Sequence, residues 1–317
     1  MLKITEVMCP VALNLFLNAR KIKDDNSLDI KLINQTINLY DIVYLRETKQ
    51  DNPGTHIKSE KEISEYLKEN ILKIVNLFFD ITNINPDSFF IEIEKNQEIE
   101  NDNSIIAGVL IGLNQHYQTN LTKKQLIDIS LHINSEIPYF IVGGYSKITN
   151  DGRDIERLGE NPFQNYLIID SGIVLDKNNI ETSVRNDYII ERSSRQEPIH
   201  NDYIKFLPQE LTNLRSFLKN YPDFQHSLSS IGPIYFVTNL NNFFSSKVSI
   251  ALQKEFPKMK FYNAKNTSGH KIMFKYPSKK QTDFKLFVFC ILFPLIFLKP
   301  YLAFYNLIHL SLQNNKI

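Results

Sequence analysis

Three carboxylates lie in a short loop, at a place where many proteins bind phosphate. Residues 89–94 alternate apolar and acidic side chains as a half-buried strand does, and residues 104–117 carry apolar side chains around much of a helical circumference. The loop between them contains Glu98, Glu100 and Asp102 and no glycine. In phosphate-binding loops, glycines let the backbone approach the anion and the first N–H groups of the helix point at it. Acidic side chains favour a helix start but repel phosphate, so the sequence predicts the form of a phosphate-binding element with the chemistry of a helix cap.

The other reactive side chains show no arrangement typical of a catalytic or metal site. Glu136 stands alone just after a predicted helix, where an isolated acid could be either a surface residue or a catalytic one. Gly143 and Gly144 follow a predicted strand with no helix start behind them, so we expect a turn rather than a phosphate cradle. Neither metal-ligand nor triad spacing is found among His116, His132, His200 and His226, or between Cys9 and Cys290. The sequence therefore predicts no metal site.

The composition is that of a globular protein without a strong electrostatic field. The chain has 317 residues, of which 43% are hydrophobic and 22% charged, with a formal net charge of +1. This length is enough for one large or two ordinary domains. A charge so near zero gives no field that attracts nucleic acid, so we expect no nucleic-acid partner. Residues 1–10 lack the apolar core of a signal peptide, and we expect a cytoplasmic location.

The order of the expected elements indicates an α+β fold. In the first half we expect strands at 4–8, 13–19, 27–40 and 42–45, a turn at 50–54, a helix at 60–79, a strand at 89–94, a helix at 104–117, and a helix at 123–133 that Thr122 caps. In the second half we expect strands at 140–144 and 166–169 with a turn at 150–152 between them, then a helix at 201–218, a strand at 234–237, a helix at 242–256 and a strand at 260–263.

The C-terminal segment is of a different kind. Residues 286–298 are an uncharged apolar run that contains Pro294, and a second, mostly apolar stretch covers 301–312. Because a helix needs about 17 to 25 apolar residues to cross a bilayer, only the two stretches together would span it. Lysines precede the run, as expected for a segment attracted to anionic lipid. We expect residues 286–312 either to attach the chain to the cytoplasmic membrane face, as a tail anchor or interfacial hairpin, or to pack on protein as a helical hairpin.

Residues 9–17, with the sequence CPVALNLFL, resemble the opening motif PAKLNLFL of the 4-diphosphocytidyl-2-C-methyl-D-erythritol kinases, members of the GHMP small-molecule kinase superfamily. The similarity continues without a gap through residues 25–41. It returns in the same order at 70–72, 93–95, 107–114, 134–140, 201–202 and 232–236. Order and spacing hold over nearly all of residues 4–270, which makes the set of matches fairly specific.

The resemblance implies a two-domain GHMP kinase fold with nucleotide and substrate in the cleft between the domains. The implied N-terminal domain, residues 1–158, is ribosomal protein S5 domain 2-like, and the implied C-terminal domain, residues 159–274, is ferredoxin-like. Residues 275–317 would form an apolar extension. The implied reaction transfers the γ-phosphate of ATP to a hydroxyl of a nucleotide-linked small molecule, with ATP and Mg²⁺ as cofactors.

The resemblance also places site residues, and the chain departs from the family at each catalytic motif. Ala12 stands where the family has a lysine, and Glu136 stands where it has an aspartate, one methylene shorter. The acidic loop replaces the family's glycine-and-serine loop, with Ser104 as its surviving residue, and the substrate loop begins at Asp25 but lacks the histidine. The implied contacts are Asn70, Ser104 and Gly232 to the cofactor, and Asn14 and Asp25 to the substrate. Asn14 could also bond a neighbouring backbone group instead.

Two interpretations follow from these departures. In the first, the chain is a diverged kinase of the methylerythritol phosphate route to isoprenoids, with Glu136 as its remaining carboxylate. In the second, it is a degenerate kinase fold, kept as a binding or membrane-associated scaffold. Loss of the lysine, the phosphate loop and the substrate histidine removes most of the electrostatic stabilisation that phosphoryl transfer needs. We therefore expect weak or absent kinase activity.

Overall fold

The structure is a computed structural model. It describes residues 3–21, 28–47, 53–86, 88–96, 98–150, 152–173, 175–176, 180, 182, 199–239 and 242–275.

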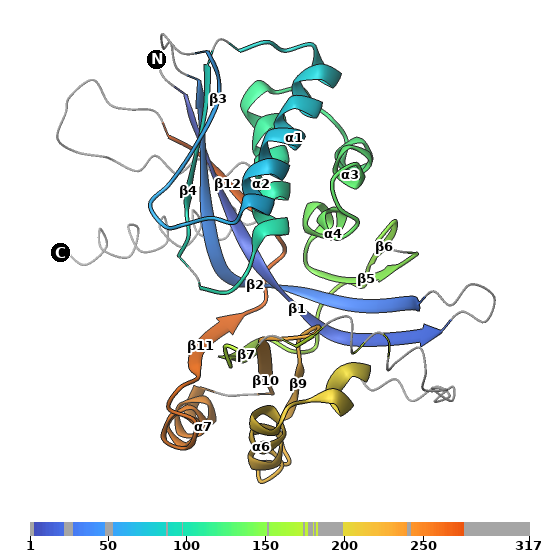
Figure 1. Ribbon diagram of the computed structural model, residues 1–317, viewed down its shortest axis with the longest axis vertical. Coiled ribbons are helices and arrows are strands. Elements are labelled where there is room, and N and C mark those ends of the chain that lie inside the picture. Colours follow the sequence, from blue (N-terminus) through green and yellow to red (C-terminus); the bar gives the residue numbers. More distant parts are fainter. Residues whose placement is uncertain are drawn as a thin grey trace, which may run out of the picture.

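A long antiparallel hairpin runs through the whole molecule and connects its two lobes (Figure 1). It consists of β1 (Ile4–Lys21) and β2 (Leu28–Glu47), each of which the sequence predicted as two shorter strands. Register shifts between Pro10 and Val11 and between Asn14 and Phe16 interrupt the pairing. Because β-bulges bend a strand and re-aim its side chains, the hairpin can leave the first sheet and cross between the lobes.

The first lobe is a mixed sheet covered on one side by helices (Figure 1). The strands run in the order β12-β1-β2-β4-β3, with β5 beside β2, β6 beside β5 and β8 beside β1. Their bounds are β3 Gly54–Ser59, β4 Ser88–Glu94, β5 Tyr145–Thr149, β6 Asp154–Arg157, β8 His200–Asn201 and β12 Lys271–Lys275. The helices are α1 Glu65–Thr82, α2 Asp102–Tyr117, α3 Lys123–Leu131 and α4 Ile137–Val142.

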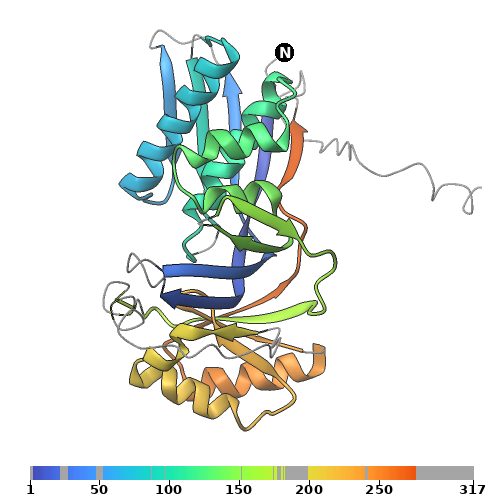
Figure 2. The same cartoon turned by 90° about the vertical axis from the view of Figure 1, so that its right-hand side faces the viewer.

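The second lobe is a smaller antiparallel sheet with two helices on its far side (Figure 2). Its strands run in the order β11-β7-β10-β9, with bounds β7 Asn165–Asp170, β9 Gln225–Leu228, β10 Ile234–Thr238 and β11 Lys260–Lys265. The helices are α6 Gln209–Leu218 and α7 Asn242–Glu255, and the 3-10 helix η1 Asp202–Phe206 leads into α6.

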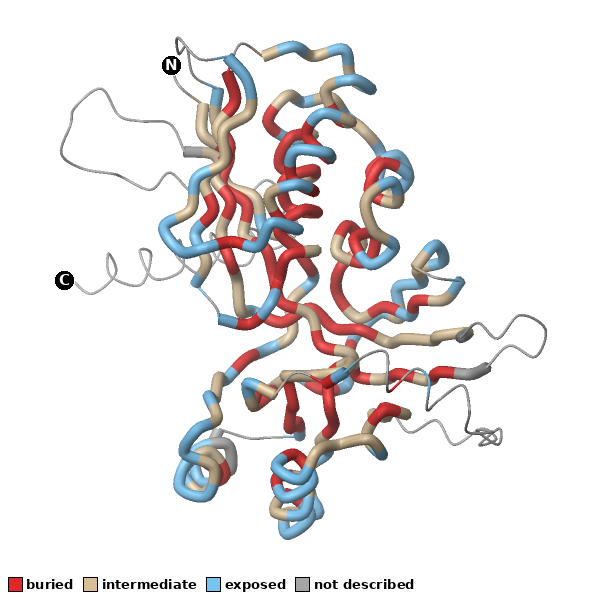
Figure 3. The backbone as a smooth tube through the Cα atoms, viewed as in Figure 1, coloured by how far each residue is buried: buried red, intermediate tan, exposed pale blue. Residues whose placement is uncertain are grey.

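The hairpin supplies core residues to both lobes, as the alternating buried segments of its strands show (Figure 3). Val7 and Cys9 of β1 are buried among the helices of the first lobe. Further along the same strand, Leu13 packs in a cluster with Phe236 of the second sheet, and Leu17 packs beneath α6 and α7. Since one continuous strand contributes to all three hydrophobic clusters, the lobes are joined by packing as well as by covalent connection.

The α+β class and most of the expected elements are confirmed. The capping box at Thr122 is present, with its hydroxyl accepting from the Gln125 amide and the Gln125 side chain accepting from the Thr122 amide. The strand expected at 140–144 is wrong, because residues 137–142 form α4 with Pro138 in its first turn. Periodicity cannot separate a strand from a helix in so short an apolar run, and Pro favours a helix start.

The helix expected at 201–218 is also partly wrong. Residues 200–201 pair with β1 as β8, and the helical part is divided into η1 and α6 at Pro208. Proline has no N–H and disfavours a helical residue before it, so it begins α6 and ends the preceding segment. Five further strands, β3, β5, β6, β9 and β12, lie in stretches where the sequence predicted none.

The division into domains at 158/159 stays a prediction. Two strands that begin in the expected second range, β8 and β12, pair with β1 in the sheet of the first lobe. The apolar segment 286–312 and Asp25 lie outside the described residues. Within the residues that are described, no helix is both long and apolar enough to cross a membrane.

Candidate functional site

A cleft of about 810 Å³ lies between the two lobes. This volume is in the range of small-molecule sites. The first group of lining residues comes from the helices of the first lobe and the loop before α2: Tyr66, Ile99, Glu100, Asn101, Asp102, Asn103, Ser135, Glu136, Tyr139 and Phe140. The second comes from the hairpin, β5, the β5–β6 turn and the β9–β10 loop: Ala12, Asn14, Ile30, Leu32, Asn34, Ile148, Gly152, Ser229, Ser230, Ile231, Gly232, Pro233 and Ile234.

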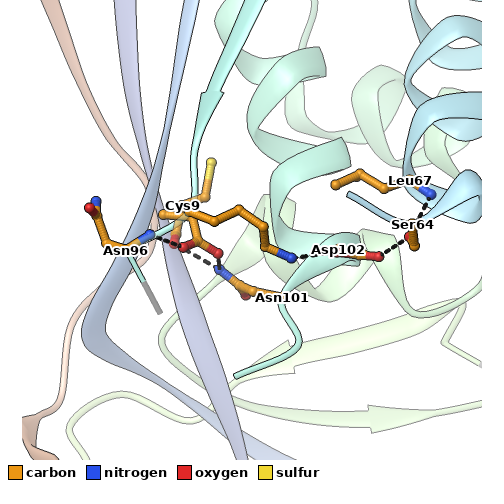
Figure 4. Close-up of polar contacts among 8 residues, drawn as sticks. Cys9, Ser64, Leu67, Asn96, Asn101 and Asp102 are labelled. Carbon is orange, nitrogen blue, oxygen red and sulfur yellow. Dashed lines mark hydrogen bonds and ion pairs between the residues drawn. The ribbon is translucent and has the colours of Figure 1, made fainter. Parts of the chain in front are cut away.

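Asp102 is the first residue of α2 and occupies the position at which a phosphate-binding helix would direct its backbone amides toward the anion. Its carboxylate accepts a hydrogen bond of 2.6 Å from the Ser64 hydroxyl and lies 3.2 Å from the Lys95 ammonium (Figure 4). The Ser64 hydroxyl in turn accepts from the Leu67 amide and caps α1. Both members of the ion pair are largely buried, with side-chain exposures of 16% for Lys95 and 8% for Asp102. The cation nearest the helix start is therefore already neutralised by the chain itself.

The residue before Asp102 ties the loop to the sheet. The Asn101 side chain donates to the Cys9 carbonyl at 3.0 Å and to the Asp41 carboxylate at 3.4 Å (Figure 4). Asp41 also accepts from the Asn96 amide at 2.8 Å, where the same loop begins. These bonds fix both ends of the loop with side chains of the protein, where a glycine-rich loop would leave its amides available to an anion.

Glu136 belongs to a closed ring of hydrogen bonds at the mouth of the cleft. The Tyr66 hydroxyl donates to Asn103 Oδ1 at 2.9 Å, and Asn103 Nδ2 donates to Glu136 Oε2 at 2.8 Å. The ring closes through Asn134, whose Oδ1 accepts from the Glu136 amide and whose Nδ2 donates to the Tyr66 hydroxyl, both at 2.9 Å. The ring joins α1, α2 and the α3–α4 loop, so Glu136 has a structural partner as well as a position in the cleft.

Burial and the carboxylates around the start of α2 raise the pKa values of Glu100 and Tyr66. The pKa of Glu100 is raised by partial burial and by the negative charges of Asp102 and Glu136, while Lys95 acts in the opposite direction. Burial also raises the pKa of Tyr66, and the same three carboxylates add to that shift. Of the described residues that line the cleft, none is Lys or Arg. The cleft therefore has a negative potential beside the start of α2.

The residues implied by the family resemblance divide into two sets. Ala12, Asn14, Glu136 and Gly232 line the cleft. Ser104 is fully buried beside it, and its hydroxyl donates to the Pro10 carbonyl at 2.8 Å instead of facing the cleft. The Asn70 side chain donates to the Tyr66 carbonyl within α1 and is not among the lining residues. The roles that the resemblance implies for these six residues in cofactor binding, substrate binding and catalysis stay predictions.

Most of the lining residues were not identified from the sequence, and Tyr66, Asn103 and Asn34 are examples. Tyr66 has the spacing of a core residue of α1, yet the residue is 41% exposed and lines the cleft. Asn103 lies in the first turn of α2, in the stretch that the sequence predicted as part of the acidic loop. Asn34 sits in an alternating strand and is buried, and only its pairing opposite Asn14 in the hairpin places it at the cleft. A polar residue at an expected core position of a strand was the signal that could have identified Asn34.

The residues around the cleft do not fit the phosphates of ATP. Bound phosphates need cations and free amides, whereas this helix start carries a carboxylate already paired with Lys95. In the part of the chain that is described, no group of His, Cys, Asp or Glu could hold a metal ion. An Mg²⁺ ion would thus have to arrive with a nucleotide that the site repels.

The chain is similar in sequence to curated kinases over about half of their length. It is 28% identical over 165 residues to the 4-diphosphocytidyl-2-C-methyl-D-erythritol kinase of Caldicellulosiruptor bescii, which covers 49% of this chain and 55% of that one. The kinase of the same name from Clostridium tetani is 32% identical over 162 residues, 50% of this chain and 56% of the relative. The Prochlorococcus marinus relative is 30% identical over 190 residues, 57% of each chain. No family model matches the chain.

Solved structures share the fold over most of the chain. A 4-(cytidine 5'-diphospho)-2C-methyl-D-erythritol kinase superimposes with a TM-score of 0.63 at 16% identity, covering 83% of this chain and all of the other. A homoserine kinase from Cytophaga hutchinsonii has the same TM-score at 14% identity, covering 85% and 97%. A mevalonate kinase from L. major gives 0.58 at 13% identity, covering 83% and 96%. The chain thus has the α+β GHMP kinase fold, and its curated homologues are 4-diphosphocytidyl-2-C-methyl-D-erythritol kinases at about 30% identity.

Proposed function

We propose that the chain is a diverged homologue of the 4-diphosphocytidyl-2-C-methyl-D-erythritol kinases whose phosphoryl-transfer activity is weak or absent. The proposal rests mainly on the start of α2, where the Asp102 carboxylate pairs with Lys95 and accepts a hydrogen bond from the Ser64 hydroxyl. Phosphoryl transfer depends on cations that spread the developing charge over the transferred group. Among the described residues that line this cleft the charged ones are all carboxylates, so the nucleotide phosphates would meet repulsion in the ground state and in the transition state.

On this proposal the fold is kept for binding. The cleft has the volume of a ligand site, and its apolar and amide residues remain. The chain would act as a binding protein or, through residues 286–312, as a scaffold attached to a membrane. That segment is outside the described residues, so its part in the proposal rests on its composition alone.

A second candidate is an active but diverged kinase that uses ATP and Mg²⁺. One observation favours it, namely that Glu136 lines the same cleft as Ala12 and Asn14. Its carboxylate would orient or deprotonate the substrate hydroxyl. Against this candidate, Glu136 already accepts a hydrogen bond from Asn103 and lies in a region without cationic lining residues. A carboxylate that is displaced by about an ångström can lose on the order of a hundredfold in rate.

Titration of the full chain with ATP and Mg²⁺ separates the two candidates. We expect no saturable binding up to about 1 mM ATP, and no turnover of the diphosphocytidyl substrate above background. The matched pair of variants is Glu136→Gln in the cleft and Glu210→Gln in the first turn of α6, away from it. Micromolar ATP binding, with turnover that Glu136→Gln abolishes and Glu210→Gln leaves intact, would establish the kinase and refute the proposal.

A further inference from the structure

The lysines of the chain are concentrated in one late segment. Residues 242–285 contain ten lysines, no arginine and two acidic residues, which gives this segment a formal net charge of +8. Because the whole chain carries +1, all other residues together carry −7. The small total charge therefore conceals a strong separation of charge along the chain. Such a separation is typical of proteins that bind a nucleic acid or a membrane surface.

The described part of this segment forms α7, β11 and β12, which lie along the same side of the molecule (Figures 1 and 2). It carries seven of the ten lysines and one acidic residue, Glu255. Two of these lysines have contacts within the chain, because Lys260 pairs with Glu98 of the first lobe and Lys271 lies over the Tyr40 ring. None of the described residues after 241 lines the cleft, so this surface is separate from the site between the lobes.

The outer face of α7 combines an apolar side chain with lysines. Val248 and Leu252 are buried against the second sheet, whereas Lys247, Ile250 and Lys254 are exposed. Spacings of three and four residues place these last three on one face of the helix. Ile250 is 67% exposed, the largest value among the exposed large apolar residues that are described. A helix that lies in a membrane interface has this pattern, with an apolar side chain that enters the headgroup region and lysines beside it.

The end of β12 brings a second apolar stretch to the same surface. β12 ends at Lys275, and ten residues that include three more lysines separate it from the uncharged run that begins at 286. Ten residues can extend to roughly 35 Å, so the run and α7 can reach one bilayer. Nucleic acid would match the charge of this surface but not its exposed isoleucine or the apolar run. A bilayer with anionic headgroups matches all three.

We propose that the exposed face of α7, formed by Lys247, Ile250 and Lys254, docks on a membrane that contains anionic lipid. Ile250 enters the headgroup region, and the two lysines contact lipid phosphates. This inference rests in part on the membrane attachment proposed for residues 286–312, and it is independent of whether the cleft binds a nucleotide. It adds that the folded second lobe itself faces the bilayer, which gives the molecule a defined orientation on the membrane.

The test is a fluorescent label at position 250 of the full chain. Ile250→Cys, made together with Cys290→Ser, carries an NBD fluorophore, whose emission rises when it leaves water, and Cys9 is buried. Vesicles of phosphatidylcholine with about 30% phosphatidylglycerol should raise this emission at least about twofold, and phosphatidylcholine alone should not. Ile81→Cys at the exposed end of α1 is the matched control and should give no rise. No rise at position 250 would overturn the proposal, even if the chain floats with the vesicles through residues 286–312.

A pair of lysine substitutions links the response to charge. Lys247→Gln combined with Lys254→Gln should weaken the apparent affinity of the labelled chain for anionic vesicles by at least about tenfold, because each lysine near such a surface contributes about fivefold. Lys123→Gln combined with Lys124→Gln, at the exposed start of α3, is the matched control and should leave the affinity unchanged. Equal effects of the two pairs would refute the role of α7. Tighter binding of the labelled chain to a duplex of about 20 base pairs than to the vesicles would also overturn the proposal and assign the surface to nucleic acid.

These measurements are separate from the test of the proposed function. Micromolar ATP binding would defeat the proposed loss of kinase activity and leave the docking of α7 as it is. A label at position 250 that does not respond would defeat the docking of α7 and leave the argument about the cleft as it is.

Discussion

The two carboxylate oxygens of Asp102 make different stabilising contacts. One oxygen accepts from the Ser64 hydroxyl, which caps α1, and the other pairs with Lys95 at the end of β4. The carboxylate therefore joins the starts of α1 and α2 to the central sheet. A negative side chain at this position is favourable for the helix dipole and unfavourable for a bound phosphate. The same carboxylate that stabilises the start of α2 therefore makes it unfavourable for phosphate.

Replacing Asp102 by asparagine should destabilise the fold through Lys95. Asn keeps the shape and can still accept from Ser64, but the largely buried Lys95 loses its counter-ion. We expect the free energy of unfolding in urea to fall by about 2 kcal/mol. Glu65→Gln, which removes the exposed ion pair with Lys68, is the matched control and should change it by less than about 0.5 kcal/mol. Equal effects of the two variants would show that the Asp102 pair has no special role.

At the scale of elements, the loop that carries Glu136 is positioned by its neighbours rather than by its own sequence. The loop lies between α3 and α4, and the β5–β6 turn packs against it at Gly152. Gly152 has a φ of +82°, and a Cβ added there would lie 1.9 Å from the Ser135 carbonyl oxygen. Only glycine allows the turn to approach the residue next to Glu136 so closely.

Substitution of Gly152 by alanine should therefore cost more than the same change at an open glycine. Gly159 also has a positive φ, +87°, but an added Cβ would meet nothing within 4 Å. We expect Gly159→Ala to lower the free energy of unfolding by about 1 kcal/mol, from backbone strain alone. Gly152→Ala should lower it by at least about 1 kcal/mol more, because the turn and Ser135 must move apart. The two values come from urea unfolding curves, and similar losses would contradict the close packing described here.

At the scale of the molecule, buried and half-buried histidines in both lobes couple stability to pH. Burial lowers the pKa of His116 and His270 in the first lobe and of His226 in the second to about 4. Lys3 adds to the shift at His116, and Arg215 and Lys219 add to it at His226. At His270 the carbonyls of Ser104 and Phe140 act in the opposite direction.

These pKa values predict lower stability in mild acid. In the unfolded chain a histidine titrates near pH 6.5, so between about pH 6.5 and pH 4 the unfolded state binds protons that the folded state does not. The free energy of unfolding should fall as the pH is lowered through this range. His226→Gln, which can keep a hydrogen bond to Tyr235, should reduce this dependence, and His132→Gln at the exposed end of α3 should not. Urea unfolding at about pH 7, 6 and 5 measures it, and an unchanged slope in His226→Gln would contradict the prediction.

Many of the individual strands, helices and caps of this structure could be predicted from the sequence. Apolar runs predicted two segments of β1, alternating side chains predicted much of β2 and all of β4, helical spacing predicted α1, α2 and α3, and Thr122 was identified as the cap of α3. The acidic loop before α2 was also evident, together with the mismatch between its form and its charge. These features depend on neighbours within a few residues, where backbone preferences and side-chain periodicity act directly.

The tertiary structure decided which of these residues form a site. It turned residues 137–142 into a helix, directed the Ser104 hydroxyl to Pro10 and joined Glu136 to Asn103 across 33 positions of sequence. It also placed Asn34 beside Asn14, and Lys95 beside Asp102. Each of these contacts is selected by packing between elements that are distant in the chain, because a polar side chain bonds to whichever partner the folded core brings within reach. Local patterns therefore determined the elements, and only the packed fold determined how the charges and amides share the cleft.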